Sequence, residues 1–297
     1  MAKRKIVDAH HHFWQLSRGY NYPWLQDTPS GEGMLGNLSP IVRDYCVADY
    51  RADAAGYDLV KSVHIEAVPA DAVTETRWLQ ETGEQSGLPS AIVGRVELHR
   101  PDAEKLMAEH RGYRNIRGIR QIVNWHRDPR FTFTDHDFLL DPVWLAGFRL
   151  LRKYDLSFDL QIYPGQMQAA ADLAARNPDT VIVLNHTGMP VDRDAAGLTA
   201  WQQGMRRLAA EPNVVAKISG LGMVDHHWTE ASIRPFVLGI IDCFGVERSM
   251  FGSNFPVDTL YGSFDALYGA FENIVASFSE SEKGRLFHDN ALRVYRL

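Results

Sequence analysis

The 297-residue sequence has little cysteine, no long hydrophobic run and no excess of positive charge. Its two cysteines, Cys46 and Cys243, are too far apart for a metal-binding or redox motif and are expected to be reduced thiols. No apolar run approaches the ~20 residues that span a bilayer, and Ile6-Val7 is too short for a signal peptide. The formal charge of −6 gives no electrostatic basis for binding nucleic acid or an anionic membrane. We therefore expect a cytoplasmic protein that has a small-molecule ligand and neither nucleic-acid nor membrane partners.

The sequence also lacks internal repeats, low-complexity segments and any linker that would divide the chain. Short apolar segments instead alternate with helix-like segments along the whole length, which is the pattern of parallel strands joined by helical crossovers. Eight such units predict a single (β/α)8 TIM barrel, an α/β fold that covers residues 1–297 as one domain. An open doubly wound sheet is the alternative, but the glycine motif that binds dinucleotides does not follow the first strand.

The apolar segments set the expected element boundaries. The predicted strands are 5–12, 59–67, 91–98, 116–123, 157–163, 180–184, 214–218 and 250–256, the last with its loop. The predicted helices are 40–56, 74–85, 101–110, 135–154 with a long loop, 166–176, 199–210 and 230–243, followed by two closing segments. Thr74 is expected to cap the second helix. An irregular loop rich in aromatic residues is expected at about residues 14–40.

The most distinctive motif is Asp8-Ala9-His10-His11-His12-Phe13-Trp14, which follows the first apolar strand. Because side chains alternate along a strand, Asp8, His10 and His12 are expected on one face and His11 on the other. Two imidazoles spaced in this way can hold one divalent ion, as nitrogen ligands do for zinc. A polar strand end or the remnant of an expression tag is the plainer alternative, although the flanking aspartate and aromatic residues argue against a tag.

Polar residues occur at the carboxyl ends of the predicted strands, where the active sites of such barrels lie. Converging imidazoles, a cation and a carboxylate are what metal-assisted hydrolysis requires, because water must be activated and the developing oxyanion stabilised. The candidates, strand by strand, are His10 and His12, His64 and Glu66, Arg95 and Glu97, Arg120 with Asn124 and His126, Gln161 and Tyr163, His186, Lys217 and Ser219, and Asn254 with Asp258.

Several of these residues also have plainer interpretations. His186 could cap the following helix instead of serving a site. Arg120 would need an anionic partner if buried, which a substrate carboxylate or a structural Glu or Asp would supply equally well. Lys217 would be a Schiff-base lysine in another barrel family, but no other feature of the sequence favours that role. Tyr163 is better suited to shape a pocket wall than to perform chemistry.

Four segments stand out together, and they are 8–14, Arg117-Gly118-Ile119-Arg120-Gln121, Leu184-Asn185-His186-Thr187-Gly188 and Phe251-Gly252-Ser253-Asn254-Phe255-Pro256. In this order they resemble the amidohydrolase superfamily, and most closely its amidohydrolase-2 group of sugar-acid lactonases and 2-pyrone-4,6-dicarboxylate lactonases. The resemblance covers essentially the whole chain. It implies a (β/α)8 barrel that hydrolyses a lactone ring, often with one divalent ion at the positions of His10 and His12, and it makes His186 the sixth-strand histidine.

Two residues depart from the pattern that the resemblance implies. The eighth-strand aspartate, usually the base that activates water, is Asn254 here, and an amide cannot accept that proton. The fifth-strand position, where many amidohydrolases have a metal-binding histidine, is Gln161. Both departures argue against a two-metal centre. They leave either a weak site for one divalent metal ion, with zinc as the expected ion, or a metal-free site.

The leading hypothesis is a hydrolase that opens the lactone of a sugar acid or a related small carboxylated ring. A lactone isomerase and a non-catalytic ligand-binding barrel are the alternatives, and homo-oligomer formation is left open. The expected metal ligands are His10 and His12. The expected catalytic residues are His12, His186, Asn254 and Asp258, and the expected substrate-binding residues are Trp14, His64, Glu66, Arg120, Asn124, His126 and Tyr163.

Overall fold

The computed structural model describes residues 3–27 and 33–297, and within them eight strands form one sheet in the order β1 to β8. Each strand pairs in parallel with the next, and β1 meets the segment after β8 through a parallel bridge between His11 and Phe255. The predicted (β/α)8 barrel is confirmed. The strands are β1 (Lys5–His11), β2 (Asp58–Ile65), β3 (Ala91–Arg95), β4 (Ile116–Ile122), β5 (Ser157–Gln161), β6 (Ile182–Leu184), β7 (Val214–Ile218) and β8 (Ser249–Phe251).

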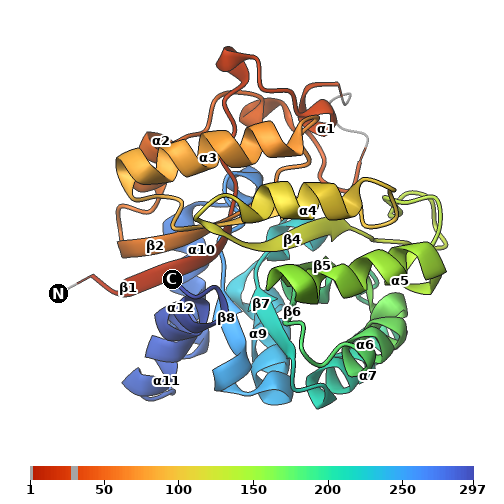
Figure 1. The fold of residues 1–297 in the computed structure, drawn as a ribbon. Helices are drawn as coiled ribbons and strands as arrows, with labels where there is room; N and C mark the ends of the chain where they lie inside the picture. The colour runs from red at the N-terminus through yellow and green to blue at the C-terminus, as the bar shows by residue number, and fades with distance from the viewer. Residues whose placement is uncertain (1–2, 28–32) are drawn as a thin grey trace.

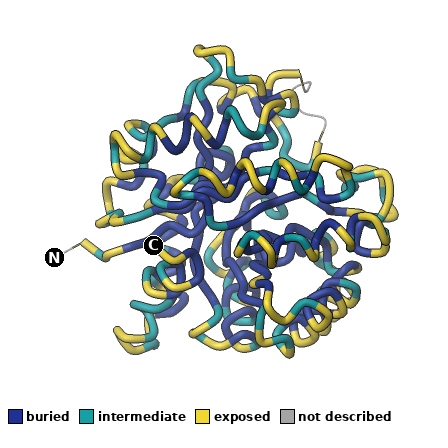
Figure 2. The backbone as a smooth tube through the Cα atoms, viewed as in Figure 1, coloured by how far each residue is buried: buried dark blue, intermediate teal, exposed yellow. Residues whose placement is uncertain are grey.

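Helices connect successive strands and surround the barrel, and β1 and the C-terminus lie toward the left of the view in Figure 1. The larger helices bury one face against the strands and expose the other, as the colours of Figure 2 show. The helices are α1 (Pro23–Gln26), α2 (Val47–Asp53), α3 (Ala72–Ser86), α4 (Ala103–Arg111), α5 (Pro142–Phe148), α6 (Met167–Arg176), α7 (Ala195–Ala210), α8 (Leu221–Val224), α9 (Glu230–Phe244), α10 (Phe264–Ile274), α11 (Glu280–Gly284) and α12 (Asn290–Val294).

The strands are buried on both faces, as expected for a barrel covered by helices. One apolar cluster contains residues from β1, β2, β3, β6, β7 and β8, which can meet only inside the barrel. A second, larger cluster joins the outward-facing strand residues to the helices. The inner cluster includes Val7, Val63, Val93, Val183, Val215 and Met250.

The barrel closes at the carboxyl end of β1, in the segment that carries the histidines. The backbone carbonyl of His10 accepts a hydrogen bond from Asn254 N at 2.8 Å, and His12 N donates to Phe255 O at 2.7 Å. The register of β1 against β2 shifts between Asp8 and His11, which interrupts the simple alternation of side chains.

The prediction that Asp8 shares a face with His10 and His12 is therefore wrong. The Asp8 carboxylate accepts a hydrogen bond from the Tyr50 hydroxyl of α2 at 2.6 Å. Tyr50 in turn stacks on His11, with ring centroids 4.4 Å apart. The irregularity in β1 directs Asp8 and His11 toward α2 and keeps His10 and His12 together on the other side.

Some helix boundaries also differ from the predicted ones. The Asp71 side chain, not Thr74, caps α3, because its carboxylate accepts a hydrogen bond from Thr74 N at 3.0 Å. Asp194 caps α7 in the same way, so this helix begins at Ala195 instead of residue 199. The predicted helix 40–56 is reduced to α2, and the segment 135–154 contains α5 followed by a 3-10 segment, Arg149–Tyr154.

The aromatic loop expected at about 14–40 contains only short helical turns among its described residues, since residues 28–32 lie outside them. Trp14 and Tyr22 are fully buried, so this excursion packs onto the barrel. It reaches the carboxyl ends of the strands, where Trp24 donates its indole N–H to Ala67 O at 2.7 Å.

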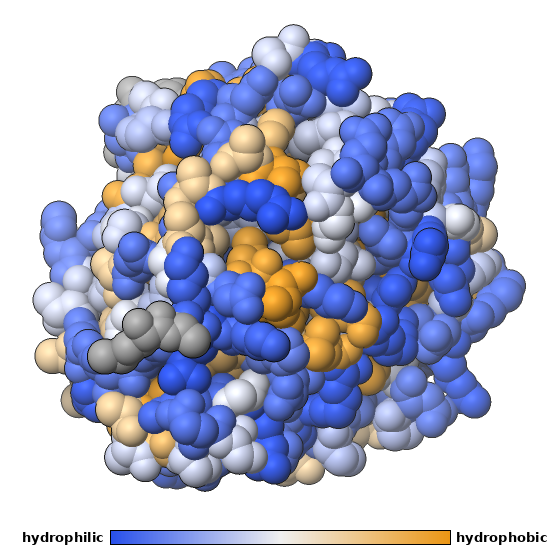
Figure 3. Space-filling model, turned by 90° about the vertical axis from the view of Figure 1, so that its left-hand side faces the viewer, coloured by the Kyte–Doolittle hydropathy of each residue, from blue (hydrophilic) through white to orange (hydrophobic). Residues whose placement is uncertain are grey.

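The outer surface is ordinary for a globular protein. No helix among residues 3–27 and 33–297 is long and apolar enough to cross a membrane. The side of the molecule that carries the N-terminus is mostly hydrophilic, with apolar side chains gathered near its middle (Figure 3). Homo-oligomer formation stays a prediction.

A buried ion pair lies inside the barrel. Lys217 Nζ on β7 is 2.5 Å from Asp159 Oδ1 on β5, and both side chains are fully buried. Tyr295, close to the C-terminus, donates its hydroxyl to the same carboxylate at 2.9 Å. Burial lowers the pKa of Lys217 to about 8, although Asp159 opposes the shift. The lysine is thus held by a carboxylate and is not presented as a nucleophile.

We predict that Lys217→Met lowers the free energy of unfolding by about 3–5 kcal/mol, because Asp159 would be left buried without its cation. Chemical denaturation measures the change. The double variant Lys217→Met with Asp159→Asn is the control, and it should recover most of the loss because no uncompensated charge is left. Equal stability of the single variant and the natural chain would contradict this account of the ion pair.

Candidate active site

A cavity of about 420 Å³ opens at the carboxyl ends of the strands. Of the predicted site residues it is lined by His12, Glu66, Arg120, His186 and Asn254. His12 and Glu66 directly follow β1 and β2, Arg120 lies near the end of β4, and His186 and Asn254 lie shortly after β6 and β8. The fold therefore brings together side chains as far apart in sequence as His12 and Asn254, which are 242 residues apart.

Three imidazoles cluster at this end of the barrel: His12 and His186 line the cavity, and His10 is fully buried against them. His10 Nε2 and His12 Nε2 are 3.3 Å apart, and the ring centroid of His186 lies 4.4 Å from that of His10. His12 Nδ1 is 2.7 Å from the carbonyl oxygen of Ile65. Because a carbonyl oxygen can only accept, Nδ1 carries the proton and Nε2 presents a lone pair. His186 Nδ1 is held by the Ser219 hydroxyl at 3.2 Å.

The three imidazoles are uncharged at neutral pH. Burial lowers the pKa of His10, His12 and His186 well below its ordinary value, because an imidazolium loses its hydration there. The guanidinium of Arg120 is the next cause for His12 and His186, whereas His186 and Lys217 are the next causes for His10. The lone pairs are therefore available to bind a cation or to accept a proton.

The donor atoms of His10 and His12 fit one divalent ion. Two nitrogen ligands of a tetrahedral zinc ion lie about 3.3–3.4 Å apart when each Zn–N bond is ~2.0–2.1 Å. The two Nε2 atoms are separated by 3.3 Å. Asn254 Oδ1 also lies 3.3 Å from His12 Nε2. His12 Nε2 and Asn254 Oδ1 are both acceptors, so a cation or a shared proton between them would be favourable, and His10 Nε2 can either donate to His12 or join it as a ligand.

The side chains at this point would bind a divalent ion only weakly. Among the residues that the structure describes, no group of three or more His, Cys, Asp or Glu side chains is placed to hold a metal ion. His10 and His12 bring their Nε2 atoms to 3.3 Å from each other, and Gln161 occupies the fifth-strand end. A two-metal centre has no support in this donor set.

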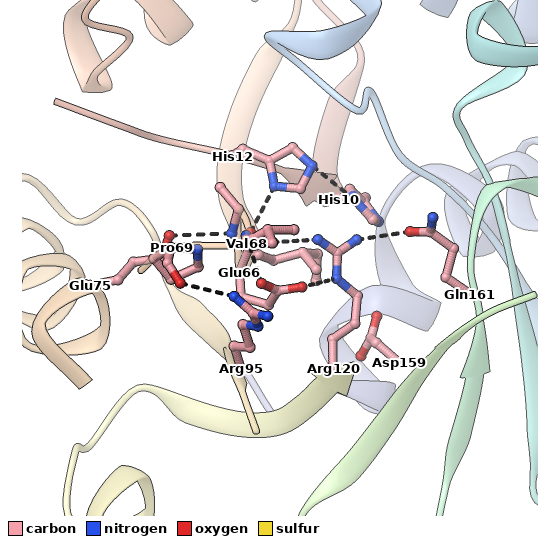
Figure 4. A network of polar contacts seen from close by, with 12 residues as sticks. His10, His12, Glu66, Val68, Pro69, Glu75, Arg95, Arg120, Asp159 and Gln161 are labelled. Carbon is pink, nitrogen blue, oxygen red and sulfur yellow. Dashed lines mark hydrogen bonds and ion pairs between the residues drawn. The ribbon is translucent and has the colours of Figure 1, made fainter. Parts of the chain in front are cut away.

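Arg120 forms a buried ion pair with Glu66 in the cavity wall (Figure 4). Arg120 Nε donates to Glu66 Oε1 at 2.6 Å, Nη1 donates to Gln161 Oε1 at 3.1 Å, and Nη2 donates to the Glu66 carbonyl. The side chains of Arg120 and Glu66 are 3% and 1% exposed. The anion that a buried Arg120 requires is thus a structural glutamate.

Asp258 lies outside the cavity lining and contacts the site through Asn254. Its Oδ1 accepts a hydrogen bond from Asn254 Nδ2 at 2.7 Å, which turns Asn254 Oδ1 toward His12. Burial raises the pKa of Asp258 to about 7, although the hydrogen bond from Asn254 acts in the opposite direction.

His64, on β2, and Trp14, after β1, do not line the cavity, contrary to expectation. His64 Nε2 is 3.3 Å from the carbonyl oxygen of Phe13, and burial lowers the pKa of His64 to about 3. The residues on both sides of His64 face the barrel interior, so alternation directs His64 outward. Trp14 is fully buried and donates its indole N–H to Arg43 O at 2.8 Å.

Asn124, His126 and Tyr163 do not line the cavity either, but they hold the loop that follows β4. The Tyr163 hydroxyl donates to Phe131 O at 2.5 Å, and its ring lies 5.6 Å from that of His126. The Asn124 carbonyl accepts from Phe133 N at 2.9 Å. Phe133 itself lines the cavity, so these residues act on its wall from outside.

The cavity also contains strand-end candidates to which no catalytic, substrate-binding or metal-binding role was assigned from the sequence. Arg95 ends β3 and forms an ion pair with Glu97 at 2.8 Å, and Gln161 ends β5. Their positions at strand ends were a usable signal. The apolar wall had no signal in the sequence, because it comes from loops and short helical turns such as α1 and α8. It includes Trp24, Met34, Leu35, Val68, Phe133, Phe138, Met223 and Val257.

Backbone strain is concentrated around the cavity. Of the non-glycine residues with positive φ in the described chain, most follow β2, β6 or β8, and these are Val68, His186, Thr187, Met189 and Asn254. Such conformations cost about 1–3 kcal/mol each and persist only where the surroundings hold them. Gly220 leaves room for the imidazole of His186, because a Cβ at position 220 would lie 2.5 Å from His186 Nδ1.

Known proteins resemble this chain over its whole length. The sequence profile of the amidohydrolase family matches residues 7–297. An uncharacterised protein of Sinorhizobium fredii is 44% identical, with 100% of both chains covered. The L-fucono-1,5-lactonase of Burkholderia ambifaria is 31% identical, with 98% of this chain and 95% of that protein covered. The crystal structure of a Burkholderia multivorans amidohydrolase with bound zinc is 28% identical and matches with a TM-score of 0.82, covering 98% of this chain and 99% of the other. The chain belongs to the amidohydrolase family, in its amidohydrolase-2 branch.

Proposed function

We propose that this protein hydrolyses the ring ester of an uncharged sugar lactone. The observation that carries the proposal is a cluster of three uncharged imidazoles, in which His12 and His186 line one cavity and the fully buried His10 contacts both. Family membership supports hydrolysis, and relatives at 31% and 30% identity carry the name L-fucono-1,5-lactonase. These findings favour ring opening over the isomerase and the non-catalytic barrel.

His186 is the proposed base. Its uncharged ring accepts a proton from the water that attacks the lactone carbonyl, and Ser219 holds the ring in place. The bond between the carbonyl carbon and the ring oxygen then breaks, and the proton passes to that oxygen, which yields a hydroxy acid. Arg120 has N–H groups beyond those that bond Glu66 and Gln161, and they can stabilise the oxyanion.

His10 and His12 are the proposed ligands of one divalent ion. Such an ion, when bound, polarises the carbonyl and stabilises the negative charge that develops on its oxygen. His12 keeps its Nε2 lone pair turned to this point because Nδ1 is bound to Ile65 O at 2.7 Å.

The charges of the cavity favour an uncharged substrate. Its two arginines are both neutralised from within, Arg120 by Glu66 at 2.6 Å and Arg95 by Glu97 at 2.8 Å. The imidazoles add no charge at neutral pH. A lactone with two carboxylates would therefore enter without a compensating cation, at a cost in desolvation. This disfavours the small carboxylated ring that the sequence left open.

The lining is polar on one side and apolar on the other, which suits a sugar ring. Arg95, Glu97 and Gln161 can bond hydroxyl groups, whereas Leu35 and Met223 offer contact to C–H or methyl groups. A deoxysugar lactone has both kinds of surface.

We expect a pH-indicator assay on a lactone panel to identify uncharged sugar lactones as substrates. Their kcat/KM should exceed that of dicarboxylated lactones by at least ~10-fold. A dicarboxylated lactone would need an unpaired arginine as its partner, and both arginines of the cavity are already paired with glutamates. A preference for dicarboxylated lactones would contradict the charge argument.

The proposed base is tested by His186→Ala, which should lower kcat by roughly 10²–10⁴-fold. His288→Ala, which removes an imidazole outside the cavity lining, is the matched control and should leave kcat unchanged. The proposal fails if no lactone is hydrolysed, or if the His186 variant keeps full activity.

Zinc content after dialysis tests the metal ligands. We expect at most one zinc ion per chain, lost in both His10→Ala and His12→Ala because two imidazoles are needed. His64→Ala removes a buried imidazole that does not line the cavity and should keep the ion. Equal zinc content in all variants would exclude the assigned ligands. If the natural chain binds no zinc, the proposed metal site is excluded, but the role of His186 as base is not.

Asp258→Asn should stabilise the fold increasingly as pH rises. The folded pKa of Asp258 is about 7 and lies above its ordinary value of 3.8, so ionisation opposes folding between these values. The gain should be near zero at pH 4 and reach a plateau above pH 7 of up to about 4 kcal/mol. Chemical denaturation at several pH values measures it, and a gain that is independent of pH would refute the assignment.

A further inference from the structure

The five residues 65–69, which end β2 and run along the cavity, are bound by side chains from several other elements (Figure 4). We call them the 65–69 segment. It supplies four carbonyl groups to donors that belong to the cavity or its wall. These are Ile65 O to His12 Nδ1 at 2.7 Å, Glu66 O to Arg120 Nη2, Ala67 O to Trp24 Nε1 at 2.7 Å, and Pro69 O to Arg95 Nη1 at 3.0 Å.

Val68 gives this segment an unfavourable backbone conformation. Its φ is 54°, and it is a β-branched residue directly before Pro69. Branching at Cβ disfavours positive φ, and a following proline restricts a residue to extended conformations. A valine in this state persists only if its neighbours hold it there.

Two carboxyl groups hold the turn. Glu66 Oε2 accepts a hydrogen bond from Val68 N at 2.7 Å. Glu75 Oε1 accepts from Ala67 N at 3.2 Å. Glu75 belongs to α3, is 2% exposed and does not line the cavity. Burial raises the pKa of Glu75 well above its ordinary value, and the neighbouring Glu66 adds to the shift.

We propose that Glu75 is a positioning residue that keeps Val68 in its left-handed conformation and thereby aligns His12 and Arg95. The bond to Ala67 N lies in the middle of the segment, between the carbonyl that fixes His12 and the carbonyl that fixes Arg95. Loss of this bond lets the turn relax toward extended backbone, and both side chains then lose their acceptors. The inference rests on the proposed lactone hydrolysis for its kinetic test only.

Glu75→Leu removes the acceptor and should raise KM for the preferred lactone by roughly 5–10-fold, the equivalent of one lost hydrogen bond. Glu75→Gln keeps an acceptor oxygen at the same place and should stay within about twofold of the natural chain. A residue that only stabilises the fold would lower the thermal midpoint and the active fraction without changing KM. An unchanged KM in Glu75→Leu would overturn the proposal.

Val68→Gly provides a second test, because glycine adopts positive φ without strain. In the Val68→Gly background, Glu75→Leu should change KM by less than half of its effect in the natural chain. Equal effects in both backgrounds would show that Glu75 does not act through Val68.

A crystal structure of Glu75→Leu separates this inference from the proposed function, since it needs no turnover. The expected result is that Val68 leaves positive φ and that Arg95 or His12 loses its backbone acceptor. An unchanged 65–69 segment would overturn the inference even if lactones are hydrolysed. A displaced segment in a protein that hydrolyses no lactone would leave the positioning role standing and exclude the proposed reaction.

Discussion

The ion pair between Glu66 and Arg120 is the interaction on which the cavity depends. A guanidinium that is 3% exposed is costly without an anion, and β2 supplies that anion 2.6 Å away. Arg120 also donates hydrogen bonds to the Glu66 carbonyl and to Gln161, so it holds the backbone after β2 in place as well as balancing the charge of Glu66. Because the charge is balanced from within, the substrate need not carry one. The proposed selectivity for an uncharged ring rests on this balance.

The imidazoles are held by the closure of the barrel. The hydrogen bonds that join β1 to the segment after β8 run from His10 and His12 to Asn254 and Phe255. The same few residues therefore close the barrel and present the lone pairs, and the positive φ of Asn254 is part of that seam. A site built on strand ends in this way is more rigid than one built on loops alone.

The fold was predictable because each strand is a short apolar segment followed by a helical one. The rule that barrel sites lie at strand ends also placed His12, Arg120, His186 and Asn254 at one cavity. It failed for His64, which lies on the outward-facing side of β2. The separate expectation from strand alternation failed for Asp8, which a register shift in β1 turns toward α2. The apolar wall was not predictable, because loops carry no periodicity that reveals their contacts. The partner of Arg120 could not be chosen from the sequence, since a ligand and a glutamate satisfy the same charge.

A crystal structure with an unreactive lactam analogue of an uncharged sugar lactone tests the central claim most directly. We expect the lactam carbonyl between His10, His12 and His186, with Arg120 still paired to Glu66. A lactam bound away from the imidazoles, or an Arg120 that leaves Glu66 to bind the ligand, would contradict the account.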